Sequence, residues 1–226
     1  MKYNFFFIHG WGFDKDFWRP VGKLINSEVF CDSVKYIDLG FFGNKNTDLT
    51  FNKKGKNIFV IHSFGLNWFL KNKINFFALF NFFSAPNFLK YQREHNLKKK
   101  ILKSMISKFN KFPCEVLNDF YVNCGLDENF KIPLKKNIPL LIDSLNDLLQ
   151  DNLEDKFFDI NFKLFSFYSF NDKVFDPSMK KIFNLKNINH NIVFFKKQNH
   201  AFPFTNPEET FKIISYKVKK LISYND

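Results

Sequence analysis

The chain has 226 residues, 45% of them hydrophobic, and a formal net charge of +12 at pH 7. This length suits a single domain with a sizeable core, or one domain that carries an inserted subdomain. The positive charge would suit nucleic acid, a membrane surface or an acidic protein. Because no zinc-finger, helix-turn-helix or aromatic RNA-binding motif accompanies it, we expect no nucleic-acid partner.

The sequence also indicates the cellular compartment of the protein. The cysteines, Cys31, Cys114 and Cys124, are too widely spaced for a disulfide framework or a metal motif. The chain does not open with the pattern of a signal peptide. Its longest apolar stretch, residues 74–86, is shorter than the ~20 residues that span a bilayer. The sequence therefore predicts a cytoplasmic protein without a membrane partner, and we expect a monomer.

The N-terminal part alternates strands and helices. Residues 3–8 form a continuous apolar run, typical of a strand buried on both faces, and are followed by the glycine-rich turn His9-Gly10-Trp11-Gly12. Later elements are predicted as a helix over 14–25, strands over 34–37 and 58–61, a helix over 66–71 and a strand over 76–83. Such alternation predicts an α/β fold with a mostly parallel sheet covered on both faces.

Residues 87–156 show helical patterns only. An apolar stripe at helical spacing runs from Leu97 to Phe109, with lysines largely on the opposite side, and further helices are expected around 115–124 and 139–150. We predict that this insertion is a helical cap over the active edge of the sheet. The core would then comprise residues 1–86 and 157–226.

The alternation resumes after the insertion. We predict a strand over 162–170, a helix over 177–183, a strand over 191–195 and a closing helix over 208–222, with Pro207 at its start. Asp172 follows the first of these strands, and His200 lies in the loop after the second. Both side chains are therefore expected at the carboxyl edge of the sheet.

Ser63 follows the strand at 58–61 and precedes a helix, which is the arrangement that exposes a nucleophilic serine on a tight turn. A nucleophilic serine needs an imidazole base and a carboxylate that orients the imidazole. His200 and Asp172 supply these groups. The backbone N–H groups of Trp11 and Phe64 are the candidates for the oxyanion hole.

The other histidines have lesser expected roles. His62 is expected to support the turn beside Ser63, and His9 to orient the glycine-rich turn through a hydrogen bond; His95 and His190 are expected at the surface. Motifs for zinc proteases, nucleotide triphosphates and dinucleotides do not occur, so we expect no metal and no cofactor.

These residues resemble the α/β-hydrolases, and among them the pimeloyl-acyl-carrier-protein methyl ester esterases of biotin synthesis, of the BioH and BioG types. The resemblance rests on FFIHGWGFD (6–14), HSFG (62–65), SFNDKVFDP (169–177) and NHAFPFTNPEE (199–209). It covers the core and hardly touches the cap. One departure lies at Ile61, where these hydrolases usually have glycine two residues before the serine.

The resemblance implies an α/β-hydrolase fold and a serine esterase that cleaves the methyl ester of pimeloyl-acyl-carrier protein. Ser63, His200 and Asp172 would be catalytic, Trp11 and Phe64 would bind the oxyanion, and Phe120 would contact the acyl chain. Because acyl carrier proteins are acidic, a basic face of the cap would attract them. The candidate residues for that face are Lys90, Arg93, Lys98, Lys99, Lys100 and Lys103.

Two alternatives remain. A serine hydrolase of this kind could act on another small ester, thioester or lipid, because a triad does not encode its substrate. A non-catalytic relative that serves as a binding module is conceivable because of Ile61. The complete Ser–Asp–His set argues against that second alternative.

Overall fold

A computed structural model describes residues 2–50, 55–72, 74–185 and 189–223. Six strands form one sheet in the order β2-β1-β3-β4-β5-β6, and every neighbouring pair is parallel. The strands are β1 (Tyr3–Ile8), β2 (Cys31–Ile37), β3 (Lys56–His62), β4 (Ala78–Phe82), β5 (Lys163–Ser169) and β6 (His190–Phe195). The mostly parallel α/β sheet expected from the sequence is confirmed.

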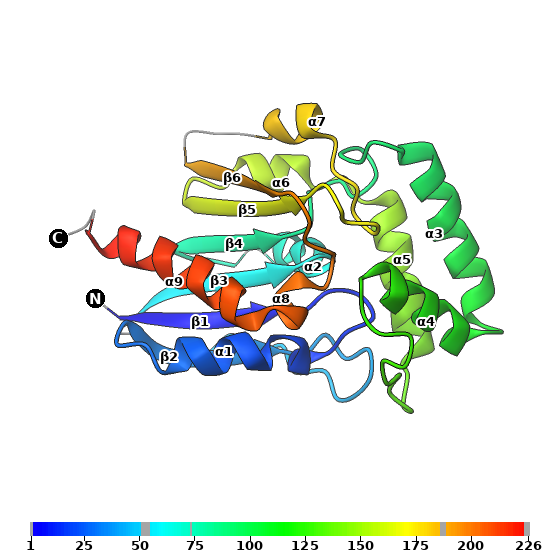
Figure 1. Cartoon of the computed structure of the whole chain (residues 1–226), viewed down its shortest axis with the longest axis horizontal. Coiled ribbons are helices and arrows are strands. Elements are labelled where there is room, and N and C mark those ends of the chain that lie inside the picture. Colours follow the sequence, from blue (N-terminus) through cyan, green and yellow to red (C-terminus); the bar gives the residue numbers. More distant parts are fainter. Residues whose placement is uncertain (1, 51–54, 73, 186–188, 224–226) are drawn as a thin grey trace.

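Helices cover both faces of the sheet, as buried parallel strands require. One face carries η1 (Lys15–Trp18), α1 (Arg19–Asn26) and α9 (Pro207–Ser223), and the other carries α2 (Gly65–Lys71) and α6 (Glu154–Phe158) (Figure 1). Trp18 of η1 packs on Phe7 and Phe82, whereas Phe69 of α2 packs on Phe59 from the opposite side. Many of the abundant phenylalanines are buried in the hydrophobic core.

Three longer helices between β4 and β5 gather beyond the carboxyl ends of the strands (Figure 1). They are α3 (His95–Phe109), α4 (Pro113–Asn123) and α5 (Ile138–Gln150). We call α3, α4 and α5 the cap helices. The described part of the chain has no helix with the length and apolar character needed to cross a bilayer.

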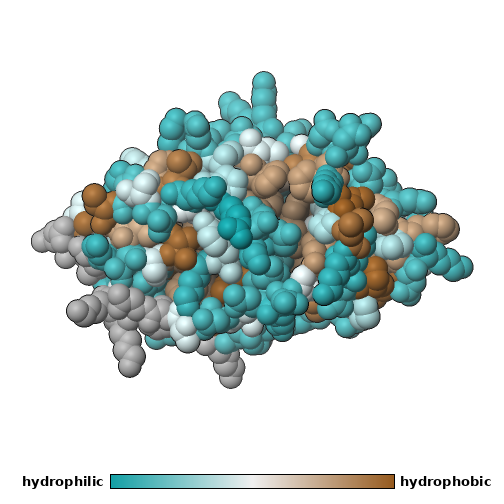
Figure 2. Space-filling view, turned by 90° about the horizontal axis from the view of Figure 1, so that it is seen from below, coloured by the Kyte–Doolittle hydropathy of each residue, from teal (hydrophilic) through white to brown (hydrophobic). Residues whose placement is uncertain are grey.

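The surface is polar over much of its area. Figure 2 shows hydrophilic residues across most of one face, interrupted by separate hydrophobic patches. Among the exposed large apolar side chains, Leu97, Ile101, Phe112, Val122 and Leu134 belong to the segment around the cap helices. This segment therefore combines a basic character with exposed apolar groups.

Three helical segments differ from expectation. The helix expected over 14–25 is divided into η1 and α1 because Pro20 lies in the first turn of α1. Proline is favoured there, but its ring would clash with the preceding turn inside a continuous helix. The loop expected around His200 contains a short helix, α8 (Phe202–Thr205), and α7 (Met179–Phe183) begins two residues later than expected.

Candidate active site

The site lies where the strand order reverses, because β1 is followed by a helix on one face and β3 by a helix on the other. Such a reversal leaves a crevice at the carboxyl ends of the strands, where open α/β sheets bind their ligands. Ile8 of β1 pairs with Ile61 of β3. Gly10 lies two residues after Ile8, and Ser63 lies two residues after Ile61. Gly10 and Ser63 therefore face each other across the crevice. A Cβ atom on Gly10 would lie 2.9 Å from Cβ of Ser63.

Ser63 occupies a strained turn between β3 and α2. Its φ angle is +51°, in the left-handed region that non-glycine residues rarely adopt. The N–H of Ser63 donates to the carbonyl of Phe82 (2.9 Å), which holds the turn against the neighbouring strand. The expected turn forms although Ile61 stands where glycine is usual.

Ser63, His200 and Asp172 form a continuous hydrogen-bonded chain. The Ser63 hydroxyl lies 3.0 Å from Nε2 of His200, and Nδ1 of His200 lies 2.7 Å from Oδ2 of Asp172. All three residues are buried. Since the carboxylate can only accept, Nδ1 of His200 carries the proton and Nε2 is free to accept one from the serine.

Asp172 is itself held by the loop that follows β5. Its second oxygen, Oδ1, accepts hydrogen bonds from the N–H groups of Val174 (2.8 Å) and Phe175 (2.9 Å). One oxygen therefore orients the carboxylate while the other faces the imidazole. The hydrogen bond to Oδ2 thereby fixes the tautomer of His200 that carries its proton on Nδ1.

The glycine-rich turn after β1 is held by His9. Nδ1 of His9 donates to the carbonyl of Gly10 (2.9 Å), and Nε2 accepts from the N–H of Leu39 (3.0 Å). The hydrogen bond expected of His9 is thus present. Among the described residues, neither the N–H of Trp11 nor that of Phe64 has an assigned acceptor, so both donors are available to a bound oxyanion.

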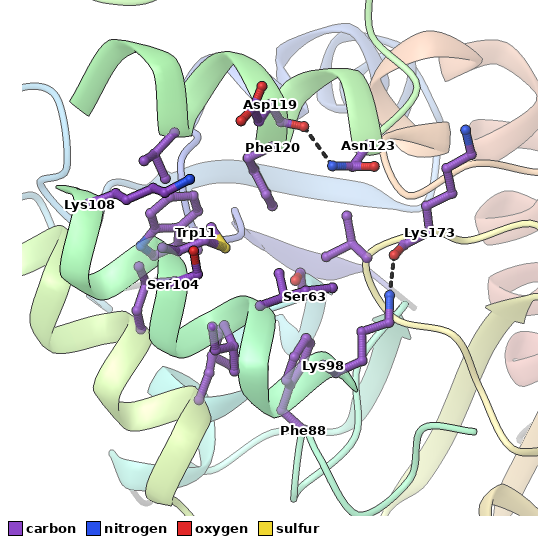
Figure 3. Close-up of a pocket in the computed structure, with 17 residues that line it drawn as sticks. Trp11, Ser63, Phe88, Lys98, Ser104, Lys108, Asp119, Phe120, Asn123 and Lys173 are labelled. Carbon is purple, nitrogen blue, oxygen red and sulfur yellow. Dashed lines mark hydrogen bonds between the residues drawn. The ribbon is translucent and has the colours of Figure 1, made fainter. Parts of the chain in front are cut away.

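A cavity of about 300 Å³ opens in front of Ser63, between the sheet edge and the cap helices. Its walls are mainly apolar, as in most small-molecule sites. Trp11, Phe88, Leu102, Met105, Val116 and Phe120 contribute to them (Figure 3). Trp11 and Phe120, both named above as candidates for substrate binding, line this cavity. The ring of Phe64, the third candidate, packs against Phe41.

The turn that contains Trp11 is tied to the cap helices. The indole Nε1 of Trp11 donates to the carbonyl of Leu141 in α5 (2.8 Å), and the hydroxyl of Tyr121 in α4 donates to the carbonyl of Gly12 (2.6 Å). Phe120 packs edge-on against the Trp11 ring. The core and the cap helices share this wall of the cavity.

The basic residues of α3 and its approach differ in their surroundings. Lys90 and Arg93 pair with Glu154 and Asp176. Lys99, Lys100 and Lys103 are exposed.

Lys98 differs from these, because it lines the cavity and its ammonium donates to the carbonyl of Lys173 (Figure 3). Burial lowers the pKa of Lys98, although Asp172 and Asp176 oppose this effect.

One histidine lies in a different environment from the one expected, and another makes a contact that was not expected. His190 was expected at the surface, but it is buried, with Nε2 2.8 Å from the Ser166 hydroxyl. The expectation was wrong because β6 begins at His190 and turns its side chain toward α6. His62, expected to support the turn, also bonds to the main chain of His200; the sequence carries no signal for that contact. His95 is exposed, as predicted.

Within the described ranges, no group of three or more His, Cys, Asp and Glu side chains is arranged to hold a metal ion.

No protein-family profile and no curated protein sequence matches the chain. Solved structures do match. The esterase EaEST of Exiguobacterium antarcticum superposes with a TM-score of 0.77 over 96% of this chain and 91% of its own, at 15% identity. A bromoperoxidase of Bacillus anthracis gives 0.77 (97% and 92%, 13% identity), and MenH of S. aureus gives 0.71 (96% and 93%, 14% identity). The chain has the α/β-hydrolase fold.

Proposed function

We propose that the protein is a serine ester hydrolase. The observation that carries this proposal is the buried hydrogen-bonded chain from Ser63 through His200 to Asp172, opening on an apolar cavity at the switch point of the sheet. A binding module would not need the strained turn at Ser63 or the free Nε2 lone pair that faces its hydroxyl. The likeness to solved esterases supports the same conclusion.

The reaction would proceed through an acyl-enzyme. Oγ of Ser63 attacks the ester carbonyl while Nε2 of His200 accepts the hydroxyl proton. The N–H groups of Trp11 and Phe64 stabilise the oxyanion that forms. His200 then protonates the departing alkoxide, which leaves as an alcohol.

In the second half of the reaction, a water molecule attacks the acyl-enzyme and gives its proton to His200. Collapse of the second tetrahedral intermediate returns the proton to Ser63 and releases a carboxylic acid. Throughout, Asp172 keeps the imidazole oriented and stabilises its charged form.

For the substrate, we propose the methyl ester of pimeloyl-acyl-carrier protein, with methanol as the leaving alcohol. Four sequence motifs in the core support this assignment, and so does the character of the cavity. Its apolar walls suit a methylene chain, while Lys98, Lys108 and Lys173 stand along its lining. Exposed Lys99, Lys100 and Lys103 on α3 would attract an acidic carrier protein.

The catalytic claim is tested by labelling with a fluorophosphonate. The wild-type protein should form one covalent adduct, and the folded Ser63→Ala variant should form none. Absence of an adduct on the folded wild-type protein would defeat the proposal.

The substrate is tested separately, by restoring growth without biotin to a strain that lacks its pimeloyl ester esterase. Growth with the wild-type gene but not with Ser63→Ala supports the carrier-linked ester. Soluble protein that hydrolyses a model ester yet fails to restore growth would instead favour a hydrolase of another small ester. The variety of esterases that share this fold makes that the second candidate.

A further inference from the structure

The ring of His62 contacts the backbone of His200 as well as the turn beside it. Nε2 of His62 lies 2.9 Å from the carbonyl oxygen of His200, and the two imidazole rings are 4.7 Å apart. Since a carbonyl can only accept, Nε2 of His62 must carry the proton. The bond joins residues 138 positions apart in sequence, so it connects the nucleophile's strand to the loop that holds its base.

His62 has an unusual environment for a polar ring. It is fully buried and stacks on Phe17 at 4.4 Å, with Phe13 at its edge. Its Nδ1 has no hydrogen-bond partner among the described residues. Burial holds the pKa of His62 well below its usual value, and the nearby His200 lowers it further. The ring therefore remains uncharged and offers a single donor, which is given to His200.

The carbonyl of His200 depends on that donor. His200 lies in a turn between β6 and α8, outside regular secondary structure. In the described part of the chain, Nε2 of His62 is the only donor assigned to this carbonyl. A buried carbonyl without a partner costs about 1–3 kcal/mol, so removal of the donor would favour a different arrangement of the turn.

A second residue with a strained backbone packs near the His200 ring. Phe83, just past β4, has a φ angle of +59°, and among described non-glycine residues only Ser63 shares a positive φ. Its ring lies 5.8 Å from the ring of His200 and 6.4 Å from that of His62. A bulky side chain in this backbone conformation is unfavourable unless the surroundings impose it. Two neighbours therefore restrict the position of His200: Phe83 packs near its ring, and His62 binds its carbonyl oxygen.

We propose that His62 is a positioning residue for the reaction, which sets the distance between Nε2 of His200 and Oγ of Ser63 by holding the His200 carbonyl. This inference rests on the proposed esterase function. The side chain of His62 does not contact the reacting atoms. It acts through the backbone of the residue that does, and its neutral state avoids a second positive charge when His200 becomes protonated during turnover.

Two substitutions separate the effect of the N–H donor of His62 from the effect of its ring volume. His62→Gln can place an amide N–H at a similar distance from Cα, while His62→Phe keeps an aromatic ring against Phe17 without a donor. On a model ester, His62→Phe should lower kcat by roughly 10–100-fold, the range expected for a misplaced catalytic group, with little change in KM. His62→Gln should recover most of that loss. A folded His62→Phe variant with wild-type kcat would overturn the proposal.

The same question can be answered without substrate. In nitrogen-15 histidine-labelled protein, we expect His62 to be protonated at Nε2 and not at Nδ1 at neutral pH. We also expect the Nδ1–H resonance of His200 to shift or broaden in His62→Phe and to return in His62→Gln. The opposite His62 tautomer, or an unchanged His200 resonance in folded His62→Phe, would refute the inference.

These resonances also separate the two proposals. If the wild-type protein forms no fluorophosphonate adduct, the esterase proposal fails, yet the resonances still decide whether His62 holds His200. If His62→Phe does not fold, His62→Leu replaces it, because leucine also lacks a donor; kcat and the His200 resonance are then measured on that variant. The tautomer of His62 in the wild-type protein needs no variant and tests the proposal in either case.

Discussion

The side chain of Ile61 occupies space that a side chain at position 65 would need. A Cβ atom on Gly65 would lie 2.9 Å from Cγ2 of Ile61 and 2.9 Å from the carbonyl oxygen of His9. Real Cβ contacts are almost never this short. The absence of a side chain at Gly65 is therefore what allows a branched residue to stand two positions before Ser63.

This relationship predicts that Gly65→Ala is destabilising, although alanine is normally the better helix former. Overpacking of this kind costs about 1–3 kcal/mol, measured as a lower free energy of unfolding in urea. Ile61→Ala should relieve part of the collision, so the double variant should lose at least about 0.5 kcal/mol less than the sum of the single losses. Additive losses would show that the two side chains do not compete.

Asp172→Asn should leave the fold intact, because Oδ1 can still accept from Val174 and Phe175. It should nevertheless lower kcat by roughly 10³–10⁴-fold, since an amide no longer fixes the tautomer of His200. The matched control is Asp176→Asn, which removes a nearby carboxylate paired with Arg93. Equal losses in the two variants would contradict the role given to Asp172.

The proposed carrier-linked substrate, together with the basic face of α3, predicts a difference between substrates. Replacing Lys99 and Lys103 by glutamine should raise KM for the carrier-linked ester and leave KM for a small methyl ester unchanged. The effect should weaken as salt is added, because exposed charges are screened. Lys98 is kept in this experiment since it lines the cavity.

Lys23→Gln with Lys212→Gln is the control for that experiment, because it removes the same charge from α1 and α9. If both double variants raise KM equally, net charge rather than the α3 face is responsible. Equal changes for the large and the small substrate would refute docking on α3.

The buried His62 also predicts how stability depends on pH. Its pKa is lowered in the folded protein by burial, so above the ordinary value of 6.5 neither the folded nor the unfolded state is protonated there. As the pH falls below about 6.5, the unfolded chain binds a proton that the folded protein excludes, and stability declines by up to ~1.4 kcal/mol per pH unit.

His62→Gln removes this titration. Its free energy of unfolding should therefore fall less steeply than that of the wild type between pH 6.5 and 5. Parallel curves would show that His62 does not contribute to the acid sensitivity.

The positions of Ser63, Asp172 and His200 were predictable because each follows a recognisable strand, and parallel strands bring their carboxyl ends to one edge. The bond from His62 to His200 was not predictable. It depends on how the loop after β6 returns to the sheet, which no local pattern specifies. The buried position of His190 was missed through an error of one residue at the start of β6, since successive side chains of a strand point to opposite faces.

The division of the first predicted helix was foreseeable in principle, because Pro20 cannot donate a backbone hydrogen bond inside a helix. The apolar spacing around it was the stronger pattern and concealed the break. The packing of the cap helices onto the core could not be read from their amphipathic pattern. It depends on single side chains, such as the Trp11 indole, which find their partners only in the folded chain.

The two hydrogen bonds that join the glycine-rich turn to α4 and α5 have a consequence for protein engineering. A chimaera that replaced residues 87–156 with the corresponding segment of another protein of this fold would remove the acceptor of the Trp11 indole and the donor to the Gly12 carbonyl. Substrate range could therefore be altered by exchange only if the donor segment restored both groups. In this protein the cap helices and the glycine-rich turn form one structural unit.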